Sequence, residues 1–119
     1  MANEITASAS LNFTYSGQTT SITVSSASTT PSEVEVISGI QSVGTSDETI
    51  SLGDLAAPGW IMLKNLDTTN YVELGPDGTN WDIKIPAGKS AGPMLWNVAA
   101  VHVKANTSPC MVSYVITGR

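Results

Sequence analysis

The strongest constraint on the fold is a side-chain pattern that repeats every two residues. In the segment 4–15, EITASASLNFTY, apolar residues occupy the odd positions and polar residues occupy the even ones. Successive side chains of a β-strand point to opposite faces, so this pattern predicts a long strand with one apolar and one polar face. No segment of useful length carries the 3.6-residue period of an amphipathic helix. The chain is therefore predicted to be all-β.

Apolar runs between turn signals continue to the end of the chain. Further strands are predicted at 21–26, 33–38, 48–52, 59–66, 71–75, 81–85, 93–97, 99–105 and 110–117. About nine short strands, with turn signals about every 8–12 residues, are typical of an antiparallel β-sandwich or jelly roll. No linker, repeat or break in composition separates one part from another. We therefore expect residues 1–119 to form a single β-sandwich domain.

The segment 59–75, GWIMLKNLDTTNYVELG, predicts a strand, a short turn and a second strand. The turn is expected from Asp67 to Asn70, since Asp and Asn side chains bond nearby backbone amides and Asn tolerates a left-handed conformation. We interpret the segment as a rigid β-hairpin that contributes to the core. The predicted core residues are Ile61, Leu63, Val72 and Leu74.

The N-terminal part, residues 1–32, differs in composition from the rest. It holds 15 Ser or Thr residues and a single charged residue, Glu4, and no Lys, Arg or Pro occurs between Ile5 and Val24. Edge strands usually carry Lys, Pro or a bulge, because an unprotected edge pairs with other chains. Either these strands are central in a sheet, or another subunit covers their edges. The second alternative makes residues 1–32 a possible assembly arm.

Charge is scarce, which excludes some partners. Only 13% of the 119 residues are charged, the formal net charge is −5, and the five basic residues are scattered. Nucleic acid binding needs clustered Lys and Arg, so it is not expected. The N-terminus lacks the features of a signal peptide, and no apolar run has the roughly 18 residues that a transmembrane helix needs. We expect a soluble chain made in the cytoplasm, without a membrane partner.

Candidate catalytic and metal-binding residues are few. The only histidine, His102, alternates with Val101 and Val103 and is expected to point away from the core, as a surface or interface residue. The only cysteine, Cys110, lies in a predicted strand and is expected to be a small buried side chain. Nucleophilic catalysis and zinc binding both need more partners than these. We predict no catalytic residue, no metal and no cofactor.

Carboxylates offer two weaker alternatives. Asp77, Asn80 and Asp82 lie close together in GPDGTNWD, but the spacing is not that of an EF-hand, and the sequence also suits a plain tight turn. Glu33 and Glu35 share a strand face, and a glycosidase would need two carboxylates facing each other across a cleft. A solvated strand face explains these two glutamates equally well. Neither group changes the prediction that the chain is not an enzyme.

The three tryptophans are the remaining candidates for a binding surface. Trp81 shares a predicted face with Ile83 and Ile85, so we expect it in the core. Trp60 and Trp96 lie on strands with bulky residues on both faces, which leaves an interface, a sugar platform and core packing open. The candidate assembly interface combines these positions with apolar residues of the first strand: Ile5, Leu11, Phe13, Trp60, Met62 and Trp96.

Residues 59–116 resemble small virion proteins of tailed bacteriophages. The resemblance rests on GWIMLKNLDTTNYVELG, IKIPAGKSAGPM and VHVKANTSPCMVSYVI, and it covers about half of the chain. It implies a β-sandwich structural protein of the particle, such as a capsid decoration or cement protein or a component of tails and fibres. That family has no catalytic residues to transfer to this chain.

From these observations we expect a non-enzymatic virion protein. The first expectation is a capsid decoration or cement protein that stabilises the head by binding across the joints between capsid subunits. Its partners would be itself, as a homotrimer, and the major capsid protein or other virion proteins. The alternative is a tail, fibre or spike module that binds a cell-surface carbohydrate.

Overall fold

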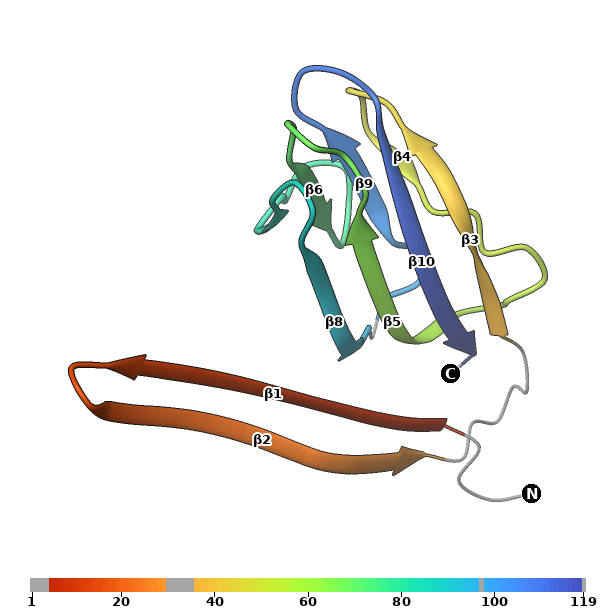
Figure 1. Ribbon diagram of the computed structural model, residues 1–119. Helices are drawn as coiled ribbons and strands as arrows, with labels where there is room; N and C mark the ends of the chain where they lie inside the picture. Colours follow the sequence, from red (N-terminus) through yellow and green to blue (C-terminus); the bar gives the residue numbers. More distant parts are fainter. Residues whose placement is uncertain (1–4, 30–35, 97, 119) are drawn as a thin grey trace. The chain divides into compact units, whose positions relative to one another are not determined.

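The computed structural model describes residues 5–29, 36–96 and 98–118, which form antiparallel β-strands and no helix (Figure 1). The prediction of an all-β chain is confirmed. Two compact units divide the chain, Met1–Pro31 and Ser32–Arg119. The second unit contains two sheets packed against each other as in a β-sandwich.

The first sheet of the sandwich has the strand order β3-β10-β5-β8. Its four strands contain a single charged residue, Lys64, and we call it the neutral sheet. The four strands are β3 (Val36–Val43), β10 (Cys110–Gly118), β5 (Pro58–Asn65) and β8 (Ser90–Leu95).

The second sheet has the strand order β4-β9-β6-β7. Each of its strands carries one Lys or Glu, and we call it the charged sheet. Its strands are shorter than those of the neutral sheet and alternate polar with apolar residues. They are β4 (Glu48–Thr49), β9 (His102–Ala105), β6 (Val72–Gly75) and β7 (Ile83–Ile85).

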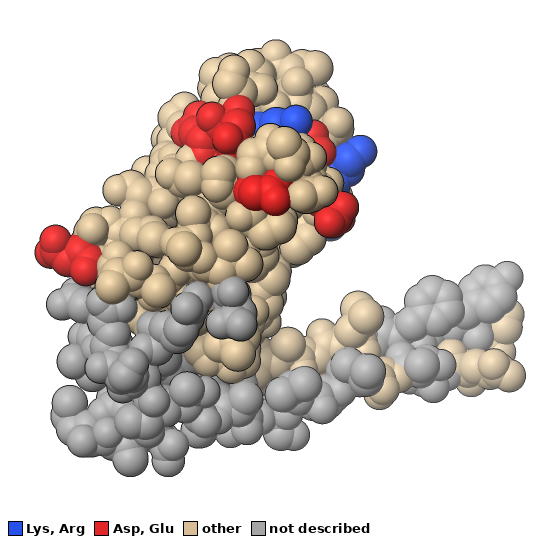
Figure 2. All heavy atoms as spheres, turned by 180° about the vertical axis from the view of Figure 1, so that it is seen from behind, with Lys and Arg blue, Asp and Glu red and all other residues tan. Residues whose placement is uncertain are grey.

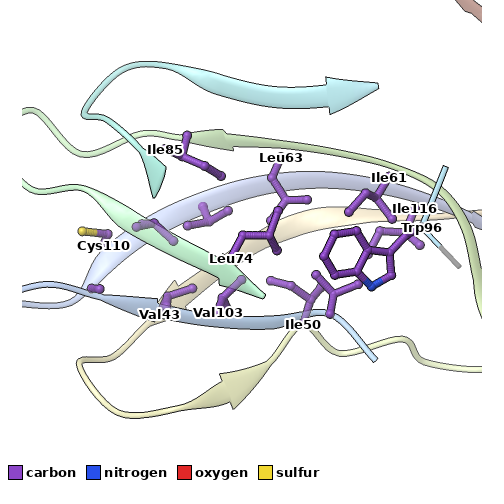
Figure 3. Close-up of a cluster of buried hydrophobic side chains, with 14 of the residues drawn as sticks. Val43, Ile50, Ile61, Leu63, Leu74, Ile85, Trp96, Val103, Cys110 and Ile116 are labelled. Carbon is purple, nitrogen blue, oxygen red and sulfur yellow. The ribbon is translucent and has the colours of Figure 1, made fainter. Parts of the chain in front are cut away.

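The core lies between these two sheets (Figure 3). The four residues predicted for it from the segment 59–75 are all fully buried, which confirms that part of the prediction: Ile61, Leu63, Val72 and Leu74. Val43, Val112 and Ile116 come from the neutral sheet, and Val103 comes from the charged sheet. The core therefore joins strands that are far apart in the sequence.

The segment 59–75 does not form the predicted hairpin. Strand β5 pairs with β10 and β8 in the neutral sheet, whereas β6 pairs with β7 and β9 in the charged sheet. The turn between them therefore takes the chain from one sheet to the other. The prediction was wrong because a short turn between two apolar strands is compatible with either arrangement, and burial of both strands' apolar faces between two sheets favours the crossing.

The turn itself lies where it was predicted. The Asp67 Oδ2 atom accepts hydrogen bonds from the backbone N–H groups of Thr69 at 2.9 Å and Asn70 at 2.6 Å. Asn65, at the end of β5, is fully buried and hydrogen-bonds to the backbone of the same turn. Side chains of this one segment thus hold the crossing between the sheets.

The first unit contains one β-hairpin, made of β1 (Ile5–Tyr15) and β2 (Gln18–Thr29). The strands pair antiparallel, with a register shift between Ala7 and Ala9. Ser16 and Gly17 connect them, both with positive φ, as the twist of a tight hairpin turn requires. The β1–β2 pair is a separate sheet of two strands.

This arrangement bears on one of the two alternatives for the N-terminal strands, whereas coverage of their edges by another subunit stays a prediction. In a sheet of two strands, each strand is an edge, so neither β1 nor β2 is central among the described strands. Of the two faces expected along this hairpin, Leu11 on the apolar face and Ser8 and Ser10 on the polar face are all exposed. Most of its other side chains lie outside the described residues. Inclusion of the hairpin in a single domain spanning 1–119 stays a prediction.

Candidate assembly surface

The outer face of the neutral sheet exposes several large apolar side chains. Strands β3, β10, β5 and β8 each point alternate residues away from the core, and most of these are apolar. Six of them are between 43% and 63% exposed: Val36, Ile40, Met62, Leu95, Met111 and Val115. The half-buried Trp60 shares this face. We call these seven residues the apolar face.

Strand pairing brings these side chains together. Val115 of β10 lies directly opposite Met62 of β5. Two residues before Met62 on β5, Trp60 lies opposite Leu95 of β8. Directly opposite residues of antiparallel strands have Cβ atoms about 4.5–5.5 Å apart, so each pair forms a contact. Val115, Met62, Trp60 and Leu95 therefore form a connected patch across three strands. The other three residues of the apolar face each lie opposite a Ser or Thr.

The patch is larger than single exposed apolar residues on a surface would produce. Six side chains on this face are each about half exposed, which amounts to roughly several hundred Å2 of apolar surface, and surfaces of this size mark interaction sites. Polar neighbours on the same face are mostly small, such as Ser38 and Ser113. This side of the sandwich is suited to contact with another protein surface.

The charged sheet has a different outer face. Glu73 lies opposite both Lys104 and Lys84 on the neighbouring strands. The Lys104 Nζ atom lies 4.6 Å from the centre of the Trp81 ring, and the Lys84 Nζ atom lies 4.6 Å from the centre of the Tyr71 ring. Figure 2 shows acidic and basic side chains of the sandwich gathered near one another. Such a face is adapted to water, so the two sides of the sandwich differ in chemistry.

The structure separates the predicted interface residues into three groups. Met62 and Trp60 lie on the apolar face, and Leu11 of the hairpin is 73% exposed. The side chains of Ile5 and Phe13 lie outside the described residues. Whether Leu11, Trp60 and Met62 take part in assembly stays a prediction.

Trp96 belongs to the core rather than to a surface. Its side chain is 8% exposed and packs among Ile61 and Ile116 (Figure 3). The indole Nε1–H donates a hydrogen bond to the Ala100 carbonyl oxygen at 2.9 Å. The ring is buried and its N–H group has a hydrogen-bond partner inside the protein. Trp96 therefore fits the core alternative and offers no contact surface for a partner or a sugar.

Sequence reasoning missed five residues of the apolar face: Val36, Ile40, Leu95, Met111 and Val115. The signal was present in the strand CMVSYVI, where Met111 and Val115 interrupt the alternation defined by Cys110, Val112 and Ile116. Apolar residues at both parities of a strand predict a contact on both faces. The strands of Trp60 and Trp96 show the same pattern.

His102 points away from the core, as predicted, because Val101 and Val103 are fully buried. Its Nδ1 atom lies 2.8 Å from the Asp47 Oδ1 atom. Trp81 meets the His102 ring edge-on, with the ring centres 6.5 Å apart. The expectation that Trp81 lies in the core is wrong. It precedes β7, so the alternation of Ile83 and Ile85 does not extend to it.

The GPDGTNWD segment forms the plain turn that was the alternative to a calcium loop. The Asp77 Oδ1 atom accepts hydrogen bonds from the backbone N–H groups of Thr79 and Asn80, each at 2.8 Å. These bonds stabilise the carboxylate and lower the pKa of Asp77 well below its usual range. The part of the chain that is described holds no group of three or more His, Cys, Asp and Glu side chains arranged to bind a metal ion.

Cys110 is buried, as expected for a strand residue of this size. Burial, followed by the negative charge of Asp67, raises the pKa of its thiol. A thiol in this environment is a poor nucleophile, since the thiolate is the reactive form. Glu33 and Glu35, the pair considered for a glycosidase, lie outside the described residues.

Comparison with known proteins finds no matching family model, no matching curated protein and no matching solved structure. Within residues 5–29, 36–96 and 98–118, no helix is long and apolar enough to cross a membrane.

Proposed function

We propose that this chain is a non-enzymatic structural protein of a bacteriophage virion, in which the apolar face is a contact surface. The observation that carries the proposal is the contrast between the two sides of one sandwich. The neutral sheet presents six exposed apolar residues and the half-buried Trp60 around one lysine, whereas every strand of the charged sheet carries a Lys or Glu. A surface of this kind, left in water, promotes association.

Within the virion, a capsid decoration or cement protein fits best. Such a protein acts by burying surface across the joints between capsid subunits. At about 25 cal/mol per Å2, a few hundred Å2 of buried apolar surface contributes several kcal/mol to each contact with a neighbouring protein before association costs. The sandwich supplies a rigid support for that surface, because Ile61 and Leu63 anchor β5 in the core directly beneath Trp60 and Met62. The resemblance of residues 59–116 to phage virion proteins supports the same assignment.

The alternative of a tail, fibre or spike module that binds a carbohydrate loses one of its two aromatic candidates. Trp96 is buried, and Trp60 alone remains on a surface among aliphatic side chains. Sugar sites combine aromatic rings with polar groups that bond the hydroxyls. The apolar face offers few such groups, so a protein partner fits it better.

Immunogold electron microscopy of purified particles from the source phage tests the proposal. Gold distributed over the head is the result expected for a decoration protein. Gold confined to the tail would replace decoration by the tail or fibre assignment. Particles without gold, from which mass spectrometry also finds the chain absent, would refute a virion role. A control antibody against the major capsid protein confirms that the particles are accessible to label.

A further inference from the structure

The β1–β2 hairpin is a sheet of two strands only. Its strands of 11 and 12 residues pair only with each other among the described strands. A two-stranded hairpin in water is marginally stable at best, and stability requires a third strand or a packed face. A hairpin of this length therefore points to a surface that covers it.

The chemistry of the hairpin restricts what that surface is. From Ile5 to Thr29 the sequence contains no Asp, Glu, Lys, Arg or His. Edge strands usually carry a bulge, a Lys or a Pro that prevents pairing with other chains. In the described hairpin, the one such feature is the register shift between Ala7 and Ala9. Leu11 is 73% exposed on β1. A neutral partner surface with apolar side chains would bury this hairpin without leaving a charge unpaired.

The apolar face is a surface of that chemistry and of suitable size. Its strands β3 and β10 have 8 and 9 residues, and at about 3.3 Å per residue they extend over roughly 26–30 Å. The hairpin strands, of 11 and 12 residues, extend over roughly 36–40 Å on the same basis. A two-stranded ribbon can therefore lie along the whole face. The charged sheet, by contrast, would place Lys and Glu against a neutral hairpin.

We propose that the β1–β2 hairpin of one copy covers the apolar face of a second copy. This inference rests on the proposed function, because it names the partner of the surface assigned there. In this arrangement each subunit binds the next through its hairpin and the previous one through its apolar face. Such a head-to-tail contact closes into a ring when the rotation between subunits allows it. The homotrimer expected from the sequence is one such ring. The occupant is the hairpin, so two apolar faces do not meet each other.

Cysteine cross-linking between separately tagged full-length chains tests the proposal. Both chains carry Cys110→Ala, which removes the buried native thiol. One chain then receives a cysteine in the hairpin and the other receives one on the sandwich, and a short bismaleimide joins thiols that lie close together. The hairpin variants are Leu11→Cys, Gln18→Cys and Ser21→Cys. The face variants are Ile40→Cys, Met62→Cys and Val115→Cys.

The matched control is Thr49→Cys, an exposed position on β4 of the charged sheet. We expect interchain products between hairpin and face variants at a yield at least about tenfold above those with Thr49→Cys, because docking raises the local thiol concentration. Equal yields with Thr49→Cys, or no interchain product in any combination, would refute the proposal. Products only between two copies of a face variant would show that faces meet each other and would also refute it.

A chain that carries both Leu11→Cys and Met62→Cys tests whether the hairpin on the apolar face comes from the same chain or from a second copy. If dilution leaves only a cross-link within one chain, the hairpin covers its own sandwich and the second copy is excluded. Because these experiments use the purified chain, their outcome is independent of the virion. Cross-links together with unlabelled particles would refute the proposed function alone, and labelled heads without cross-links would refute the hairpin contact alone.

Discussion

Replacement of Asn65 by aspartate tests how the crossing between the two sheets is held. Asn65 is fully buried, and its Nδ2 atom donates hydrogen bonds to the carbonyl oxygens of Asn70 at 2.8 Å and Ile85 at 3.0 Å. Its Oδ1 atom accepts a hydrogen bond from the Asp67 backbone N–H at 3.0 Å. One side chain thus joins the end of β5 to the turn after it and to β7.

Aspartate has nearly the same shape as asparagine, so the Asn65→Asp substitution changes the electrostatics and leaves the packing intact. It removes both donor bonds and places a carboxylate oxygen against two carbonyl oxygens. A buried carbonyl left without its donor costs about 1–3 kcal/mol, and two such losses predict that the free energy of unfolding falls by about 3–5 kcal/mol at pH 7. Natural domains of this size have only about 5–15 kcal/mol in total.

The pH dependence of this variant has a defined sign. Burial against carbonyl oxygens disfavours the charged form, so the pKa of the new carboxyl is raised in the folded state above its unfolded value of about 3.9. The folded state then binds more protons than the unfolded state between these two pKa values, and stability falls as pH rises through that window. Below the unfolded pKa the new carboxyl group is protonated in both states. In the folded state its O–H can then donate one of the two hydrogen bonds that the Asn65 amide made.

Urea denaturation at pH 3.5 and pH 7, followed by tryptophan fluorescence, measures the effect. Thr68→Asp is the matched control, because it adds the same charge to the same turn at an exposed position. We expect Thr68→Asp to change the free energy of unfolding by less than about 0.5 kcal/mol. An Asn65→Asp variant within about 1 kcal/mol of the original chain at pH 7 would refute the claim that Asn65 holds the crossing.

Three further predictions concern single side chains. Trp96→Ala should lower the free energy of unfolding by about 3–5 kcal/mol in urea denaturation, because it empties a core position; a loss below about 1 kcal/mol would place the indole outside the core. NMR should show the Asp77 carboxyl titrating well below 3.8, because the turn hydrogen bonds lower its pKa in the folded chain. The charged carboxylate therefore stabilises the fold at pH values above the unfolded pKa, and this stabilisation is lost as pH falls through the folded pKa. A midpoint at or above 3.8 would contradict the turn hydrogen bonds. Cys110 should resist alkylation by iodoacetamide at pH 7.5 in the folded chain and react in urea, since it is buried and its thiol pKa is raised; equal rates in both conditions would contradict its burial.

The sequence predicted the strands of this fold better than their partners. Alternation in 4–15 and the apolar run in 110–117 identified β1 and β10 within a residue or two. The pairing of β5 with β10 depends on contacts about fifty residues apart, which no local pattern encodes. For the same reason the segment 59–75 was predicted as a hairpin, although its strands lie in different sheets.

The candidate surface was predictable in part. Trp60 and Met62 were identified because a strand with bulky residues on both faces needs two contacts. Trp96 follows the same local pattern but lies in the core, since it comes after the last residue of β8 and its side chain fills the space between the sheets. The neutral character of the whole sheet became visible only when four distant strands were placed side by side.

The most direct test of the account is hydroxyl-radical footprinting of the chain, first as a monomer in dilute solution and then assembled in phage particles. Met62 and Met111 are exposed on the apolar face and are readily oxidised, while Trp81 reports on the charged sheet. We expect oxidation of both methionines to fall several-fold on assembly, with Trp81 changing much less. Unchanged oxidation of Met62 and Met111 in the particle, with Trp81 protected instead, would show that the wrong side of the sandwich was assigned.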